Sequence, residues 1–269
     1  MQYALVNNIR LEAFAGGKGI CAMCGADMIA KCGNRIIHHW AHAYKQNCDP
    51  WWENETQWHR NWKNFFPEEW REVTHLAPSG EIHRADVKTS NGIIIEFQHS
   101  AISDSERIAR EEFYGNLIWV IDGKPFKQNF DIFHLLPNPD SELAQDIVWK
   151  KASRQAKGAA NGIFWRLSEN PDNNGFVQIH GFNKIKKEIE ESYCGHHQYD
   201  WIRPRKTWQD ATCPVYIDFG GESLVRLEEY DKSKLPCIRF ISKKTFLDDI
   251  CRESSALNVA ASKYFLELK

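Results

Sequence analysis

The sequence lacks the features that would place it in a membrane or direct it out of the cell. No run of residues approaches the roughly 18 consecutive apolar residues that a membrane-spanning helix needs. The first residues, MQYALVNNIRLEAF, do not combine a basic start with an apolar run and a cleavage site, the pattern of a signal peptide. We therefore expect a cytoplasmic protein, in which its eight cysteines stay reduced and a close group of them indicates metal binding or chemistry.

The chain also lacks a strong excess of charge, internal repeats and low-complexity tracts. Its net charge of -2 argues against nucleic-acid binding through overall positive charge, but leaves a local basic surface open. With 269 residues it can bury a sizeable core. The density of motifs predicts three parts, residues 1–50, 51–135 and 136–269, with the last boundary in the polar, proline-marked segment 135–142.

What the first part does contain is a group of cysteines and histidines. CAMCG begins at Cys21, and a Cys-x-x-Cys followed by Gly is typical of a zinc knuckle, which supplies two of four ligands. The candidates for the other two are Cys32, His38, His39, His42 and Cys48. We select His39 and His42 of HWAH, and predict that Cys21, Cys24, His39 and His42 bind a structural Zn²⁺ in a zinc-ribbon-like module over residues 1–50. Free buried thiols are the alternative.

The middle part reads as an α/β unit. Aromatic residues at steps of three and four predict a helix in 51–66, which Pro67 ends. Alternating or apolar patterns predict four strands, at 70–77, 81–89, 93–100 and 116–122. Ser103 and Glu106 form a capping-box pattern at the start of a second helix, which runs to Tyr114. The order helix, three strands, helix, strand predicts an antiparallel hairpin region followed by a crossover helix. The third part is predicted to be mixed α+β.

Two carboxylates carry the strongest functional signal. Asp86 and Glu96 fall on the two strands of one predicted hairpin, roughly opposite each other, where like charges repel unless a cation lies between them. Mg²⁺ or Mn²⁺ suits such a pair. Gln98 shares the face of Glu96 and can orient a water, and Glu55 can add a third carboxylate. The pattern fits metal-assisted phosphodiester hydrolysis, whereas a hairpin whose acids simply face water is the plainer alternative.

These residues also resemble a known family. Glu55, Asp86 and Glu96-Phe97-Gln98, on helix, strand and strand, resemble the PD-(D/E)XK nuclease superfamily in its E-x-Q variant. More closely, HRADV and IIEFQHSAIS, with the upstream Cys-x-x-Cys and HWAH, resemble the competence protein CoiA-like family of predicted nucleases over residues 20–122. The resemblance implies a restriction-endonuclease-like core and a Mg²⁺- or Mn²⁺-dependent deoxyribonuclease, with endonuclease action favoured. Glu55, Asp86, Glu96 and Gln98 would be catalytic, and the three acids would bind the metal. It implies DNA as substrate, with RNA as an alternative, in competence-related DNA processing or in defence against foreign DNA.

The chain departs from the superfamily at Gln98, where most members have Lys. A neutral amide cannot stabilise a hydroxide as an ammonium can, so positive charge would have to come from elsewhere. Candidate assistants in the site are His59, Lys63, Arg84 and His99. Basic residues expected to contact nucleic acid are Arg107, Arg110, Arg203, Arg205 and Lys206. Two alternatives stay open: a catalytically inactive nucleic-acid-binding module, and a scaffold subunit that joins a partner protein of the same system.

Overall fold

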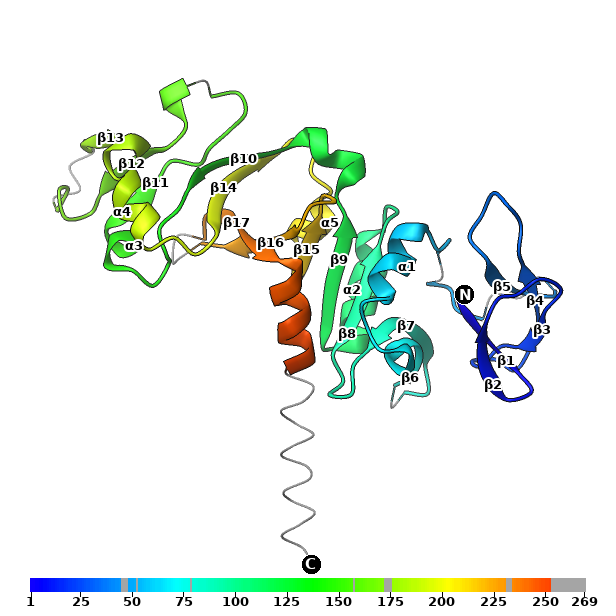
Figure 1. The fold of residues 1–269 in the computed structure, drawn as a ribbon. Helices are drawn as coiled ribbons and strands as arrows, with labels where there is room; N and C mark the ends of the chain where they lie inside the picture. The colour runs from blue at the N-terminus through cyan, green and yellow to red at the C-terminus, as the bar shows by residue number, and fades with distance from the viewer. Residues whose placement is uncertain are drawn as a thin grey trace, which may run out of the picture. The chain divides into compact units, whose positions relative to one another are not determined.

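The computed structural model describes residues 1–44, 48–51, 53–77, 79–156, 158–171, 176–230 and 234–252, and shows an α/β protein (Figure 1). The chain forms two compact units. The first comprises Met1–Asp122 with Ala211–Cys213 and a stretch from Leu247, and the second comprises Gly123–Asp210 with Pro214–Phe246. The boundary thus lies at the end of a strand at Asp122, and not in the expected segment 135–142. No helix in the described part of the chain has both the length and the apolar character that a membrane crossing requires.

The N-terminal part of the first unit is a five-stranded antiparallel sheet in the order β2-β1-β3-β4-β5. Its strands are β1 (Tyr3–Val6), β2 (Ile9–Glu12), β3 (Lys18–Ile20), β4 (Asp27–Lys31) and β5 (His39–His42). A small core of buried side chains includes Met28 and Trp40. Gly19 of β3 lies so close to β1 that a Cβ would come within 2.9 Å of the Leu5 carbonyl oxygen. This part of the chain is the one for which a zinc-binding module is expected.

The rest of the first unit holds four neighbouring strands of a mixed sheet, in the order β9-β8-β7-β6. Its elements follow the predicted order: α1 (Gln57–Lys63), the 3-10 turn η1 (Glu68–Trp70), β6 (Arg71–Leu76), β7 (Ile82–Lys88), β8 (Ile94–Gln98), α2 (Asp104–Tyr114) and β9 (Leu117–Asp122). Strands β6, β7 and β8 pair antiparallel, and α2 crosses over so that β9 runs parallel to β8. The first helix is shorter than predicted, because Thr56 caps its N-terminus.

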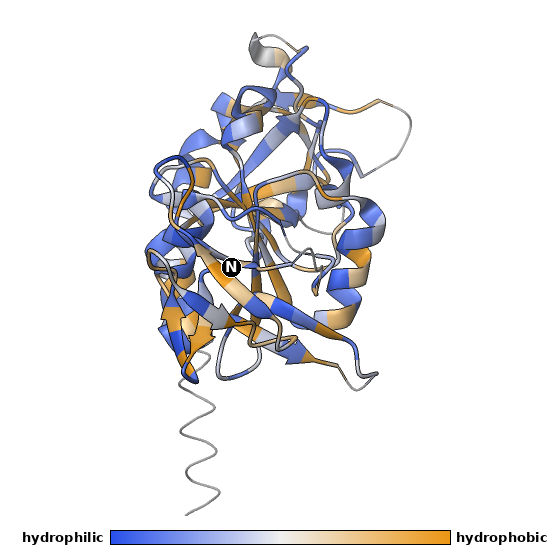
Figure 2. Cartoon of the chain, turned by 90° about the vertical axis from the view of Figure 1, so that its right-hand side faces the viewer, coloured by the Kyte–Doolittle hydropathy of each residue, from blue (hydrophilic) through white to orange (hydrophobic). Residues whose placement is uncertain are grey.

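Burial explains the apolar sequence of β8. This strand lies between β7 and β9, and each of its five residues is buried. The chain enters it through the predicted turn, where the Gly92 N–H donates to the Thr89 carbonyl oxygen at 3.0 Å. Beyond it, the Ser103 hydroxyl caps α2 by accepting from the Glu106 N–H at 3.1 Å. The expected capping box is only half present, since the Glu106 carboxylate binds Arg110 instead. Figure 2 shows hydrophobic residues on many of the strands and hydrophilic residues along much of the helices and loops.

The second unit is also mixed α+β, as predicted for the C-terminal part. Five antiparallel strands have the order β10-β14-β17-β16-β15: β10 (Phe130–Leu135), β14 (His196–Trp201), β15 (Val215–Asp218), β16 (Ser223–Glu229) and β17 (Pro236–Ser242). A three-stranded sheet consists of β11 (Ile147–Trp149), β12 (Ile163–Arg166) and β13 (Ile179–Gly181). The short helices are η2 (Lys124–Asn129), α3 (Glu142–Asp146), η3 (Gly158–Ala160), η4 (Phe182–Lys184), α4 (Lys186–Glu191) and α5 (Lys206–Gln209). From residue 243 the described chain is helical to 252.

Candidate functional site

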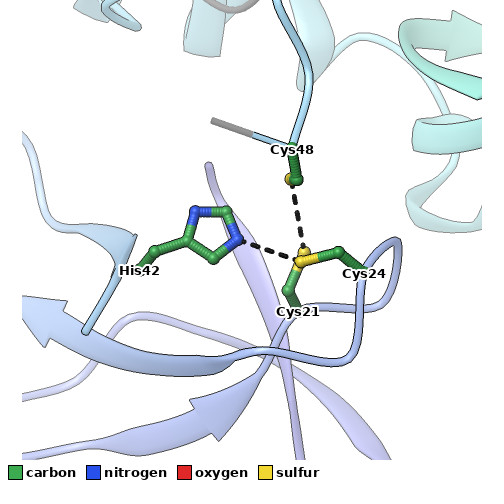
Figure 3. Close-up of side chains that lie close together, drawn as sticks. All are labelled: Cys21, Cys24, His42 and Cys48. Atoms are coloured by element: carbon green, nitrogen blue, oxygen red, sulfur yellow. Dashed lines mark hydrogen bonds between the residues drawn. The ribbon is translucent and has the colours of Figure 1, made fainter. Parts of the chain in front are cut away.

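Three thiols and one imidazole meet in the N-terminal sheet. Cys21 and Cys24 lie in the turn between β3 and β4, His42 ends β5, and Cys48 follows in the next segment (Figure 3). Their four donor atoms all lie within 4.8 Å of one another. Cys24 Sγ is 3.3 Å from His42 Nε2, and Cys21 Sγ is 4.0 Å from Cys48 Sγ. Three sulfurs and one ring nitrogen are a donor set that Zn²⁺ prefers, so this group can bind zinc.

The turn that carries the first two ligands has the backbone of a zinc knuckle. The Gly25 N–H donates to the Cys21 carbonyl oxygen at 2.9 Å, and Gly25 has a φ of 72°, which only glycine adopts without strain. Burial opposes ionisation of Cys21, but backbone N–H groups in this turn donate to its sulfur and lower its pKa. Burial and the neighbouring Cys21 raise the pKa of Cys48 to about 12. Zinc binding must therefore displace a proton from Cys48.

The fourth ligand differs from the one selected from the sequence. His39 is not part of the group, since its Nδ1 lies 2.9 Å from the Ile37 carbonyl oxygen. Cys48 takes its place. The spacing of HWAH suggested two ligands on one short strand, but adjacent positions in a strand point to opposite faces and His39 and His42 are three apart, so they project to opposite sides of β5.

A second group of titratable residues lines a cavity of about 50 Å³ in the four-stranded sheet region, enough for a small cation with water. Six carboxylates line it: Asp49, Glu53, Glu55, Glu72, Asp86 and Glu96. Three basic side chains accompany them: Lys63, Arg84 and Arg110. Met1, which carries the N-terminal α-amino group, and His59 line the cavity as well. If the six carboxylates, the three basic side chains and the α-amino group were ionised and His59 neutral, the cavity would carry an excess of two negative charges. Such an excess favours protonation of an acid or binding of a cation.

Asp86 and Glu96 lie opposite each other, as the hairpin pattern predicts. Strands β7 and β8 pair at Lys88 with Ile94 and at Val87 with Ile95, so Asp86 and Glu96 are next in register. At this pair, the carboxylate of each residue accepts a hydrogen bond from a backbone N–H of the other strand. The Asp86 N–H donates to Glu96 Oε1 at 3.2 Å, and the Phe97 N–H donates to Asp86 Oδ2 at 3.0 Å. Each carboxylate is thus held by a backbone amide at the point where the two strands separate.

The two acids resist ionisation when no cation is bound. Burial and the charge of Asp86 raise the pKa of Glu96 to about 8, although Arg110 opposes this with a hydrogen bond of 3.1 Å to Glu96 Oε2. Burial likewise raises the pKa of Asp86, although the side chain keeps 26% of its accessible surface. A cation between these carboxylates would relieve both effects.

Glu55 is held by basic residues in this structure. It forms ion pairs with Lys63 and with Arg60, the latter at 2.7 Å. Lys63 is buried and also pairs with Glu72 at 2.9 Å, while its Nζ lies 4.0 Å from Asp86. Burial disfavours the charged lysine, but Glu72 and Glu55 outweigh it and raise its pKa. Lys63 is therefore a fixed positive charge beside Asp86, where the sequence suggested only a candidate.

Glu53 is a pocket residue that the sequence did not reveal. The Gln98 amide donates to Glu53 Oε2 at 3.0 Å, and the Ser100 hydroxyl donates to the same oxygen. His59 Nε2 lies 2.8 Å from Glu53 Oε1. Since His59 Nδ1 accepts from the Thr56 N–H at 3.2 Å, its proton lies on Nε2 and points to Glu53. Gln98 and His59 therefore orient a carboxylate. In the sequence, the only sign of a role for Glu53 is that it lies just before a helix and near other acids.

The remaining candidates lie in different surroundings. His99 Nδ1 is 2.8 Å from Asp122, and Arg84 lines the cavity. Arg107 and Arg110 are buried and paired with Glu111 and Glu96, which corrects the expectation that they face nucleic acid. The three other basic candidates belong to the second unit, next to α5: Arg203, Arg205 and Lys206. Of these, Arg203 and Lys206 are exposed, and the Arg205 guanidinium lies 5.2 Å from the Phe126 ring.

The acids Glu55, Asp86 and Glu96 do not converge as closely as the cysteine and histidine group. Within the described residues, the cysteine and histidine group alone brings three or more such donors within 4.8 Å of one another. The reason lies in the partners above, because Lys63 and Arg110 each draw a carboxylate toward themselves. No protein-family model, curated protein or solved structure matches this chain.

Proposed function

We propose that this protein is a metal-dependent nuclease that hydrolyses phosphodiester bonds, with DNA as its preferred substrate. The observation that carries the proposal is the pair Asp86 and Glu96, placed in register where β7 and β8 separate and fixed by backbone amides. Their raised pKa values and the excess of acids in the cavity favour a divalent cation there. Mg²⁺ or Mn²⁺ at this position would lower the pKa of an attacking water and offset charge on the phosphate.

The residues around the two acids have separate roles in this proposal. Asp86 and Glu96 ligate the cation, and Glu55 can join them if it leaves Lys63. Lys63 supplies the positive charge that Gln98 cannot, because its ammonium lies 4.0 Å from Asp86. Gln98 acts indirectly by orienting Glu53, whose carboxylate can position a water at the cavity.

The order of elements and acids supports placing this core among the PD-(D/E)XK nucleases, and the CoiA-like resemblance extends this to competence-related DNA processing or defence against foreign DNA. Helix α1, the strands β6 to β8, helix α2 and the parallel strand β9 follow in the expected order, with Asp86 and Glu96 on β7 and β8. In the same proposal the cysteine and histidine group holds a structural zinc ion.

The test is a cleavage panel of supercoiled, linear and single-stranded DNA and of RNA, each with Mg²⁺ and with Mn²⁺. We expect Asp86→Asn and Glu96→Gln to abolish cleavage, because each removes a charged ligand. The matched control is Glu112→Gln, the same chemical change at an exposed position on α2, which should cleave like the wild type. Equal cleavage by all four proteins would overturn the assignment of the two acids.

Two observations favour a second candidate function, a nucleic-acid-binding module without cleavage. Gln98 replaces the usual lysine and is engaged with Glu53, and Glu55 is engaged with Lys63. Binding that weakens with salt, does not depend on divalent cations and leads to no cleavage of any substrate in the panel would support it.

A further inference from the structure

We propose that the zinc site positions the carboxylate cavity, through a linking segment formed by residues 48–51 and 53–56. This segment begins at a zinc ligand, Cys48, and ends at Thr56, the cap of α1. Between them it carries Asp49, Glu53 and Glu55, three of the six acids that line the cavity. An effect of this coupling on cleavage rests on the proposed function, whereas the structural coupling between the zinc site and the cavity does not.

The residue next to the zinc ligand is fixed to the strand that carries Asp86. Asp49 is buried, with 5% of its surface exposed. Its Oδ1 lies 2.9 Å from His83 Nδ1, and its Oδ2 accepts from the Arg84 N–H at 3.0 Å. Both partners belong to β7. A displacement of Cys48 would therefore reach β7 through the buried Asp49 carboxylate. It would reach this strand at Arg84, two residues before Asp86.

The next contact reaches the partner of Glu96. The Trp51 ring stacks on the His83 ring, with centroids 3.4 Å apart and an angle of 11° between the planes. The Trp51 carbonyl oxygen accepts from the Arg110 guanidinium at 2.6 Å, and the same guanidinium donates to Glu96 at 3.1 Å. The linking segment thus helps to hold the basic group that lies against Glu96.

The segment has no regular secondary structure to hold it. Its described residues belong to no helix or strand, so its position depends on side-chain contacts and on its two ends. One end is the helix cap at Thr56. The other is Cys48, and the zinc ion would tie this thiolate to Cys21, Cys24 and His42 in the sheet. Without the ion, Cys48 has only weak thiol contacts in the group, such as the one with Cys21 Sγ at 4.0 Å. The ion therefore supplies the anchor of the segment.

Two backbone amides report on this coupling directly. The Arg84 N–H donates to Asp49, and the His99 N–H donates to Glu53 at 3.3 Å, so each amide of the sheet region depends on an acceptor in the linking segment. Their hydrogen exchange can be followed by NMR on the full chain, with zinc bound and after zinc is removed by a chelator. We expect exchange at both amides to become at least about tenfold faster without zinc, equal to ~1.4 kcal/mol of local stability. The amides of β9 should keep their protection.

The variant Cys48→Ser should give the same result without a chelator, and Cys32→Ser is its matched control. Cys32 is a thiol that directly follows β4 of the N-terminal sheet and lies outside the four-ligand group. Its variant should keep zinc and the slow exchange at both amides. If Cys48→Ser does not fold, chelation of the wild type tests the same point. Unchanged exchange at Arg84 and His99 after zinc loss would overturn the proposal, and so would equal loss of protection throughout β9. A zinc-loaded wild type that shows the coupling but cuts no substrate would refute only the proposed function.

Discussion

Replacing Glu96 with Gln should change how the stability of the protein depends on pH. Burial and Asp86 raise the pKa of Glu96 to about 8 in the folded chain, whereas a glutamate in an unfolded chain titrates near ~4.5. The folded state therefore binds this proton more tightly than the unfolded state. The resulting stabilisation is fully present below the unfolded pKa and is lost as pH rises through about 8. Gln cannot lose a proton, so the variant lacks this dependence.

The expected size follows from the linkage of one proton. Each pH unit between the two pKa values changes the free energy of unfolding by ~1.4 kcal/mol. Between pH 6 and pH 8, which keeps clear of acid release of zinc, we expect the wild type to lose roughly 2 kcal/mol relative to Glu96→Gln.

Urea unfolding of the zinc-loaded proteins at several pH values, without Mg²⁺ or Mn²⁺, measures this difference. Added Mg²⁺ should reduce the pH dependence of the wild type, since the cation would replace the proton on Glu96. The variant Glu112→Gln should follow the wild type. If the curves of Glu96→Gln and wild type run parallel over this range, Glu96 does not take up a proton on folding and the reasoning on the cavity is wrong.

Three further predictions concern the zinc group, the buried lysine and a helix cap. Cys48→Ser should bind zinc much more weakly by metal analysis of the purified protein, whereas His39→Gln should keep one zinc per chain; the opposite pattern would restore His39 as the ligand. Lys63→Met should lower the free energy of unfolding by roughly 3–5 kcal/mol, because it leaves Glu55 and Glu72 buried without their partner; the exposed Lys31→Met is the control, and equal urea midpoints would contradict the ion-pair network. Ser103→Ala should lower it by about 1 kcal/mol through loss of the α2 cap, and no change in the urea midpoint would show that the cap hydroxyl is replaced by water.

The sequence predicted well what depends on local patterns. The alternation in β7, the apolar run of β8 and the turn before Ile93 determine a hairpin, and the hairpin register alone places Asp86 opposite Glu96. The Cys-x-x-Cys-Gly turn likewise marks Cys21 and Cys24, because the knuckle is a local structure.

What could not be predicted depends on contacts between distant segments. Whether His39 or Cys48 completes the zinc group is decided by how the chain leaves β5. Glu53 is bound at the cavity partly by Gln98 and Ser100, which lie far along the sequence. Arg110 has the charge of a nucleic-acid contact, but helix α2 packs it against Glu96. A residue type can be read locally, but the choice between a buried partner and an exposed one requires the tertiary structure.

The turn between β7 and β8 also fixes the number of residues between Asp86 and Glu96. Side chains alternate between the two faces of a strand, so removing or adding one residue between Asp86 and Glu96 would shift the register by one position. With one residue removed, Phe97 would stand where Glu96 lies, and with one added, Ile95 would. In both cases Glu96 and Gln98 would turn to the opposite face of β8. Such a change alters neither acid, yet it would separate them. The number of residues in this hairpin is therefore as much a determinant of the cavity as the carboxylates themselves.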